Sequence, residues 1–134
     1  MNILIWDDDL RHIPHVCDLL RLYGHDVRQV TSLADFKSIY SQFKPDGLLI
    51  DLMMPLIGIP IDDPLGEYVA GIYIYNKVIR PLLPTTPFLI YTGTALNMDI
   101  VFESIKSLEC YPEFKGVLEK GAADEDTIIH RLQG

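Results

Sequence analysis

Four short, mostly apolar segments of this chain each lead into a polar residue, and this repeated pattern is the strongest constraint on its fold. Short apolar runs bounded by turn residues are typical of strands buried on both faces of a parallel sheet. Such strands end at one edge of the sheet, where α/β proteins bind their ligands. We therefore expect the polar residues after these segments to meet at that edge: Asp7, Asp51, Thr92 and Lys120.

Helical and strand-like segments alternate along the whole chain. Strands are predicted at about 2–7, 26–31, 47–51, 87–92 and 116–119. Helices are predicted from about residue 12 to Gly24, and at about 33–43, 66–80, 96–108 and 124–132, the third ending before Pro81. This order predicts an α/β fold of (βα)5 type, a doubly wound five-stranded parallel sheet with helices on both faces. Residues 1–134 are expected to form a single domain.

Composition excludes several classes of function. The net charge of −8 argues against direct binding of nucleic acid, because phosphate backbones are bound by Lys/Arg surfaces. No apolar stretch has the length of a membrane span, and the first residues lack the basic region of a secretory signal, so we expect a cytoplasmic protein without a membrane partner. Cys17 and Cys110 are expected to be reduced thiols, with Cys17 in the core.

The acidic residues after the first and third predicted strands suggest a metal site. Asp7, Asp8 and Asp51 would repel one another at one sheet edge unless a cation joined them. Without a His/Cys ligand set nearby, the cation that fits is Mg²⁺. Asp9 is assigned to capping or solvent, and His12 and His15 to a surface helix face.

The same residues carry a resemblance to a known family. Residues 3–9, Ile-Leu-Ile-Trp-Asp-Asp-Asp, resemble the first strand and acidic pair of response-regulator receiver domains. Residues 45–55 resemble their phosphoacceptor strand with the Asp-x-x-x-Pro that follows, and Thr92-Gly93 and Lys120 match the residues after the family's last two strands. The resemblance covers nearly the whole chain and implies the flavodoxin-like fold of CheY-like proteins.

The resemblance also implies a function in a two-component phosphorelay. Asp51 would be the phosphoacceptor, taking a phosphoryl group from a sensor histidine kinase or a histidine phosphotransfer protein. Such a domain is a signalling module, with self-phosphorylation and autodephosphorylation as its only reactions, and its effector domain could lie outside this chain. By resemblance, Mg²⁺ would be held by Asp8, Asp51 and the Met53 carbonyl, and by Asp7 through water. The phosphoryl oxygens would contact the Lys120 ammonium, the Thr92 hydroxyl, and the N–H groups of Met53 and Gly93.

Three features depart from the family pattern. Gly71 matches the glycine that opens the third helix but follows a lengthened loop, about 56–65, which we expect to respond to phosphorylation. Gly121 stands where the family has proline after the lysine, and Val117 stands where it has an aromatic switch residue. A short β-branched side chain cannot reproduce the aromatic movement.

Two other functions remain open at this stage. A pseudo-receiver, an interaction module that is not phosphorylated, would account for the missing aromatic residue. A small phosphatase of the haloacid-dehalogenase type would use Asp7 as its nucleophile. The two phosphoryl-transfer hypotheses name different nucleophiles, Asp51 and Asp7, so substitution of each residue separates them.

Overall fold

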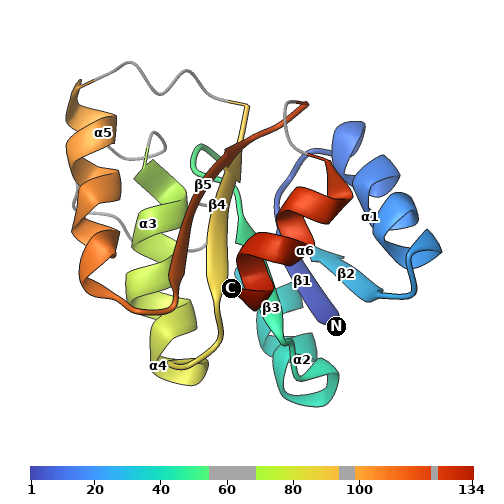
Figure 1. Cartoon of the computed structure of the whole chain (residues 1–134). Helices are drawn as coiled ribbons and strands as arrows, with labels where there is room; N and C mark the ends of the chain where they lie inside the picture. Colours follow the sequence, from blue (N-terminus) through green and yellow to red (C-terminus); the bar gives the residue numbers. More distant parts are fainter. Residues whose placement is uncertain (55–68, 94–98, 122–123) are drawn as a thin grey trace.

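The protein is built on one five-stranded parallel sheet (Figure 1). The computed structural model describes residues 1–54, 69–93, 99–121 and 124–134. The strands lie in the order β2-β1-β3-β4-β5, and all four neighbouring pairs are parallel. Their bounds are β1 Asn2–Trp6, β2 Asp26–Val30, β3 Gly47–Ile50, β4 Phe88–Thr92 and β5 Phe114–Glu119. The predicted doubly wound fold is confirmed, although β5 begins ahead of the predicted residue 116.

Helices cover both faces of the sheet (Figure 1). Helices α1 and α6 pack on one face, and the remaining described helical segments pack on the other. The bounds on the first face are α1 His12–Leu22 and α6 Glu125–Gln133. Those on the second face are α2 Leu33–Phe43, α3 Ala70–Ile74, η2 Tyr75–Ile79, α4 Arg80–Leu82, α5 Asp99–Lys106 and η3 Ser107–Cys110.

Alternate residues of each central strand enter different cores, which explains why the strands are apolar throughout. In β1, Ile3 and Ile5 pack under α1 and α6, whereas Leu4 and Trp6 pack under α2 and α3. Cys17 is buried on the α1 side as predicted, and Cys110 is exposed; both are free thiols. Two cores of this kind hold the sheet rigid and fix the strand ends.

Local signals in the sequence set the helix ends. The Ser32 hydroxyl accepts a hydrogen bond from the Asp35 N–H at 3.1 Å and so caps α2. Gly24, just past the end of α1, has a φ of 92°, which glycine adopts without strain. Asp124 caps α6 through the Thr127 N–H at 2.8 Å.

The helix that packs beside β3 and β4 does not end before Pro81, contrary to the prediction. Residues Tyr75–Ile79 form a π-helical turn, and the helix continues through Arg80–Leu82. A proline has no N–H to donate, and its ring clashes with the carbonyl four residues earlier in a regular α-helix. The wider π-turn moves those carbonyls, so the helix passes through Pro81.

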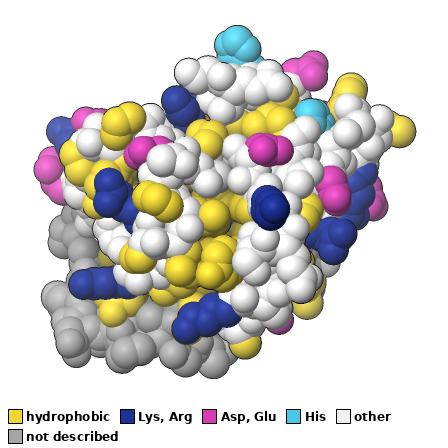
Figure 2. All heavy atoms as spheres, turned by 90° about the horizontal axis from the view of Figure 1, so that it is seen from below, with side chains coloured by type: hydrophobic (Ala, Val, Ile, Leu, Met, Phe, Trp, Pro, Cys, Tyr) yellow, Lys and Arg dark blue, Asp and Glu magenta, His cyan; other side chains and the backbone are white. Residues whose placement is uncertain are grey.

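Seen from below, the molecule presents the end of the sheet where the strands begin (Figure 2). Hydrophobic side chains gather at the middle of this face, with charged side chains spread around them. The predicted loop 56–65 and its Asp62 and Asp63 lie outside the described residues. Within the described part of the chain, no helix is both long and apolar enough to cross a membrane.

Candidate functional site

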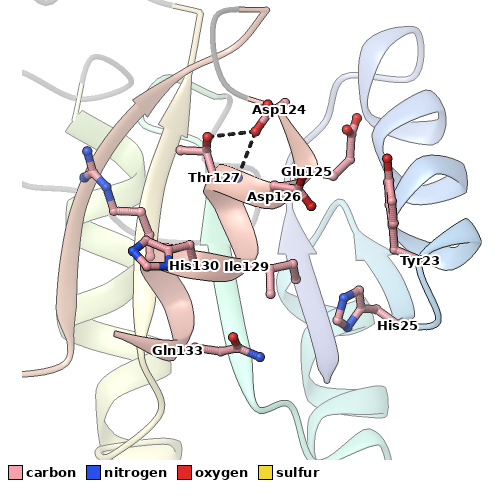
Figure 3. A pocket seen from close by; sticks show the side chains of 10 residues that line it. Tyr23, His25, Asp124, Glu125, Asp126, Thr127, Ile129, His130 and Gln133 are labelled. Atoms are coloured by element: carbon pink, nitrogen blue, oxygen red, sulfur yellow. Dashed lines mark hydrogen bonds between the residues drawn. The ribbon is translucent and has the colours of Figure 1, made fainter.

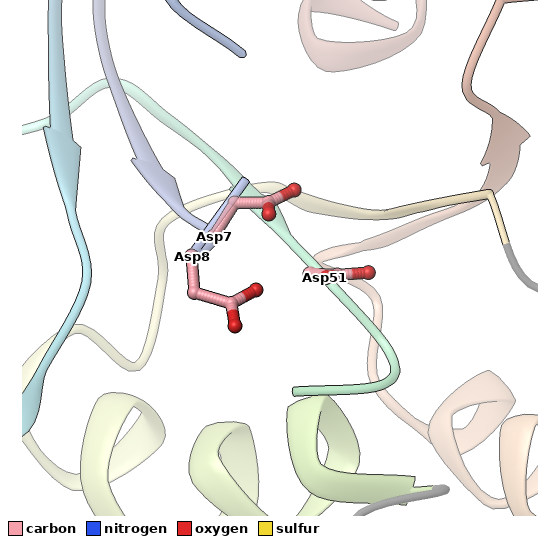
Figure 4. A group of neighbouring side chains, drawn as sticks. All are labelled: Asp7, Asp8 and Asp51. Carbon is pink, nitrogen blue, oxygen red and sulfur yellow. The ribbon is translucent and has the colours of Figure 1, made fainter. Parts of the chain in front are cut away.

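Three carboxylates meet at the end of the sheet where the strands finish. One oxygen from each of Asp7, Asp8 and Asp51 lies within 4.8 Å of the others, and the three groups point into one space (Figure 4). Asp7 and Asp51 are buried, whereas Asp8 is exposed. Oxygen ligands of this kind suit Mg²⁺, which keeps several waters and takes few protein ligands.

The strand register places these carboxylates. Trp6 pairs with Ile50, and the Asp51 N–H donates to the Trp6 carbonyl at 3.0 Å, so β1 and β3 finish level. The Gln29 side chain of β2 donates through Nε2 to the carbonyls of Asp7 at 2.8 Å and Asp9 at 3.1 Å. The sequence reasoning missed Gln29, because an amide on a strand gives no signal of its own.

Lys120 brings a positive charge into the acidic cluster. Its Nζ lies 2.6 Å from Asp7 Oδ2, 3.6 Å from Asp51 Oδ2 and 3.8 Å from Asp9 Oδ2. The Lys120 N–H donates to the Thr92 carbonyl at 2.9 Å, which fixes the end of β5 against the end of β4. Lys120 is only 13% exposed, so its ion pairs are shielded from solvent.

Thr92 and Gly93 complete the described edge of the site. Thr92 is buried, and its side chain lowers the pKa of Asp51. A Cβ at Gly93 would lie 3.8 Å from Lys120 Cδ, an ordinary contact, so an alanine fits there. Met53, whose backbone the resemblance assigns to metal and phosphoryl binding, is half-buried two residues after Asp51.

Gly71 explains how close the third helix comes to the site. Its N–H donates to the Leu52 carbonyl at 2.9 Å. A Cβ on Gly71 would overlap the Asp51 carbonyl oxygen and lie 3.1 Å from Leu52 Cα. Only glycine therefore permits the first turn of α3 to support the backbone that carries Asp51.

Burial and like charges change the acidity of the site. Burial, and then the nearby Asp7 carboxylate, raise the pKa of Asp51 to about 7 against the lowering effects of Lys120 and Thr92. Burial also raises the pKa of Asp7. Burial by itself would lower the pKa of Lys120, but its hydrogen bond to Asp7 and the surrounding carboxylates raise it. Lys120 is therefore cationic, and the site retains repulsion that a divalent cation would relieve.

This acidity predicts a dependence of stability on pH. Because the folded state binds a proton on Asp51 that the unfolded state releases, the contribution of Asp51 to the free energy of unfolding should fall between about pH 4 and about pH 7. With EDTA present, the melting temperature of the wild type should fall relative to that of Asp51→Asn as the pH rises through this window. Mg²⁺ should reduce this difference in melting temperature by stabilising the wild type. A difference in melting temperature between the two proteins that calorimetry finds unchanged by pH and by Mg²⁺ would contradict this.

Two features of the first helix differ from the sequence interpretation or extend it. His12 was expected on the surface, but it is half-buried and its Nε2 lies 3.1 Å from the Tyr91 hydroxyl. A buried tyrosine hydroxyl needs a polar partner, and the His12 side chain at the start of α1 reaches it. His15 is exposed, as predicted. Asp9 accepts hydrogen bonds from the N–H groups of Arg11 and His12 at the start of α1, and it also faces Lys120.

The residues that depart from the family pattern have local structural roles. Gly121 has a φ of 84°, a conformation that glycine adopts freely, and the described residues contain no cis peptide bond. Val117 pairs with Ile90 on β4 and packs against the core as a half-buried residue. An aromatic side chain is thus replaced by a small one beside β4.

A groove of about 720 Å³ lies away from the acidic cluster, between the end of α1 and helix α6 (Figure 3). Tyr23 and His25 line one side, and residues of α6 line the other. The Asp124 carboxylate at its rim is occupied by the Thr127 N–H and hydroxyl. The groove does not bring the strand-end residues together and plays no part in the candidate site.

Solved structures with the same fold are receiver domains. The receiver domain of NtrX from Brucella abortus is 19% identical, with a TM-score of 0.69 and 98% of both chains covered. A CheY-like receiver domain protein from Methanospirillum hungatei is 19% identical, with a TM-score of 0.66, 98% of this chain and 89% of that chain covered. In a longer NtrX structure, 96% of this chain matches 25% of that chain, at 19% identity and a TM-score of 0.68.

These likenesses establish the receiver-domain fold. The chain spans about a quarter of the longer NtrX chain, whereas it matches nearly all of the isolated receiver domain. No protein-family profile and no curated protein matches the sequence.

Proposed function

We propose that the protein is a phosphoacceptor domain of a two-component phosphorelay, with Asp51 as the residue that is phosphorylated. The observation that carries this proposal is the convergence of Asp7 and Lys120 on Asp51, with Lys120 Nζ 3.6 Å from Asp51 Oδ2 and 2.6 Å from Asp7 Oδ2, and with buried Thr92 lowering the pKa of Asp51. Phosphoryl transfer needs a nucleophile together with groups that position and neutralise the phosphoryl oxygens, and these residues supply both.

In the proposed reaction, an oxygen of Asp51 attacks the phosphorus of a phosphohistidine on a sensor kinase or a histidine phosphotransfer protein. A P–O bond forms to Asp51, and the P–N bond to the histidine breaks, which returns a neutral imidazole after it takes up a proton. Lys120 moves its ammonium from the carboxylates to a phosphoryl oxygen. Thr92 donates its hydroxyl to another oxygen, and the N–H groups of Met53 and Gly93 face the third.

The donor set fits Mg²⁺. Asp8 and Asp51, with the Met53 carbonyl, would hold the cation, and Asp7 would hold it through water. Bound there, Mg²⁺ would neutralise charge on the phosphoryl group and keep Asp51 ionised. The pKa of Asp51 supports this need, because burial first, and then the neighbouring Asp7 carboxylate, raise it to about 7 although Lys120 lowers it.

The geometry favours Asp51 over Asp7 as nucleophile, and so disfavours the phosphatase hypothesis. Asp7 is fully buried, with Oδ1 accepting from the Asp9 N–H at 2.8 Å and Oδ2 2.6 Å from Lys120 Nζ. The Asp51 side chain is 8% exposed, against 1% for Asp7, and its oxygen lies farther from Lys120 Nζ, at 3.6 Å. The pseudo-receiver remains the second candidate, because Val117 replaces the aromatic switch.

Incubation with Mg²⁺ and acetyl phosphate, followed by intact mass spectrometry, tests the proposal. We expect a gain of one phosphoryl group in the wild type, its loss in Asp51→Asn, and a residual gain in Asp7→Asn. A gain that survives Asp51→Asn but not Asp7→Asn would support the phosphatase chemistry. A folded wild type that gains nothing would support the pseudo-receiver.

A further inference from the structure

Asp9 connects the first turn of helix α1 to Lys120. Its Oδ1 accepts hydrogen bonds from the N–H groups of Arg11 at 2.8 Å and His12 at 2.9 Å. Its Oδ2 lies 3.8 Å from Lys120 Nζ. One carboxylate therefore holds the N–H groups at the start of α1 and faces the ammonium of the candidate site at the same time.

The Asp9 carboxylate is held in place from several sides. Its backbone N–H donates to Asp7 Oδ1 at 2.8 Å, and its carbonyl accepts from Gln29 Nε2 at 3.1 Å. The hydrogen bonds from the N–H groups of His12 and Arg11 lower the pKa of Asp9, so the group is an anion at neutral pH. Because both its backbone and one oxygen are engaged, Asp9 cannot follow Lys120 when the ammonium moves.

We propose that Asp9 is a positioning residue that restrains the Lys120 ammonium on the α1 side of the site, so that a phosphoryl group on Asp51 has to compete with Asp9 for it. In the resting structure Asp7 Oδ2 is the nearest of the three carboxylates to Lys120 Nζ, at 2.6 Å, and Asp51 Oδ2 and Asp9 Oδ2 follow at almost equal distances of 3.6 Å and 3.8 Å. A dianionic phosphoryl group would also be repelled by the fixed charge of Asp9. The competition rests on the proposed function of Asp51; the restraint of Lys120 does not.

Asp9→Asn removes the negative charge of residue 9 but keeps an oxygen that can accept the hydrogen bonds at the start of α1, since asparagine serves at helix starts as well as aspartate does. Asp124→Asn is the matched control, because the Asp124 carboxylate also accepts a hydrogen bond from a backbone N–H at the start of a helix, α6, and is exposed. Both variants should fold with melting temperatures close to that of the wild type.

The resting-state restraint is tested by the ¹H–¹⁵N NMR signal of the Lys120 ammonium, which is assigned by its loss in Lys120→Arg. We expect Asp9→Asn to shift this signal and to speed its exchange with water by at least about threefold, as loss of a neighbouring charge implies. Asp124→Asn should leave it in place. A Lys120 signal unchanged in Asp9→Asn would overturn the proposal.

The competition is tested by the affinity for beryllofluoride in Mg²⁺, measured by ¹⁹F NMR. Asp9→Asn should bind this phosphoryl mimic about three- to tenfold more tightly than the wild type and Asp124→Asn. Equal or weaker binding in Asp9→Asn would overturn the competition. If none of the three proteins binds beryllofluoride while the ammonium signal still shifts, the proposed function fails and the restraint by Asp9 stands.

Discussion

Replacing Lys120 with methionine should lower the free energy of unfolding at pH 7 by about 3 kcal/mol, because it leaves buried carboxylates without their cation. Methionine keeps much of the length of the side chain and removes only its charge. Asp7, whose side chain is 1% exposed, loses its partner at 2.6 Å, and Asp51 loses its partner at 3.6 Å. Urea unfolding measures the change. The loss should shrink as the pH falls, because Asp7 and Asp51 then take up protons and no longer need a cation.

Lys106→Met is the control for this prediction. Lys106 pairs with Glu103 at 3.7 Å on the surface of α5, where both side chains are about half exposed or more. An exposed pair of this kind contributes less than about 1 kcal/mol. If Lys120→Met cost no more than Lys106→Met, the charge cluster would not be the stabilising feature described above.

Gly71→Ala should destabilise the protein by about 3 to 5 kcal/mol and weaken Mg²⁺ binding. The added Cβ would overlap the Asp51 carbonyl oxygen, so either α3 or the backbone of Asp51 and Leu52 must move. In an ordinary helix position, replacing glycine with alanine stabilises the helix. A loss of stability in Gly71→Ala would therefore identify the close approach to Asp51 as its cause. Urea unfolding and Mg²⁺ titration measure the two losses.

Gly93→Ala is the matched control, since it places the same methyl group at another glycine of the site. Among the described residues, a Cβ there meets only Lys120 carbons, at 3.8 and 3.9 Å. Its effect on stability should stay within about 1 kcal/mol. A Gly71→Ala protein as stable as Gly93→Ala would show that α3 is free to shift without cost.

The fold and the proximity of the strand-end residues were predictable from sequence, because they depend little on contacts between distant segments. Continuous apolar runs imply strands buried on both faces, and parallel strands finish at one edge whatever their order. That is sufficient to bring Asp7, Asp51, Thr92 and Lys120 together. The cap of α2 was also predictable from sequence, because Ser32 and Asp35 lie within four residues of each other in the chain.

Contacts between distant segments could not be predicted in this way. The pair of His12 and Tyr91 depends on how α1 packs on the sheet, and periodicity does not give that packing. The π-turn before Pro81 likewise depends on tertiary packing, since Tyr75 is buried against Phe88 with ring centroids 3.7 Å apart. Asp9 was assigned to capping or solvent, and its distance to Lys120 follows only from the assembled sheet.

Chemical trapping of an acyl phosphate tests the central claim most directly. After incubation with Mg²⁺ and acetyl phosphate, borohydride reduces a phosphorylated aspartate to homoserine, and peptide mass spectrometry locates the converted residue. The account predicts homoserine at position 51 alone, with none formed in EDTA. Conversion at Asp7, or no conversion in the folded wild-type protein, would contradict it.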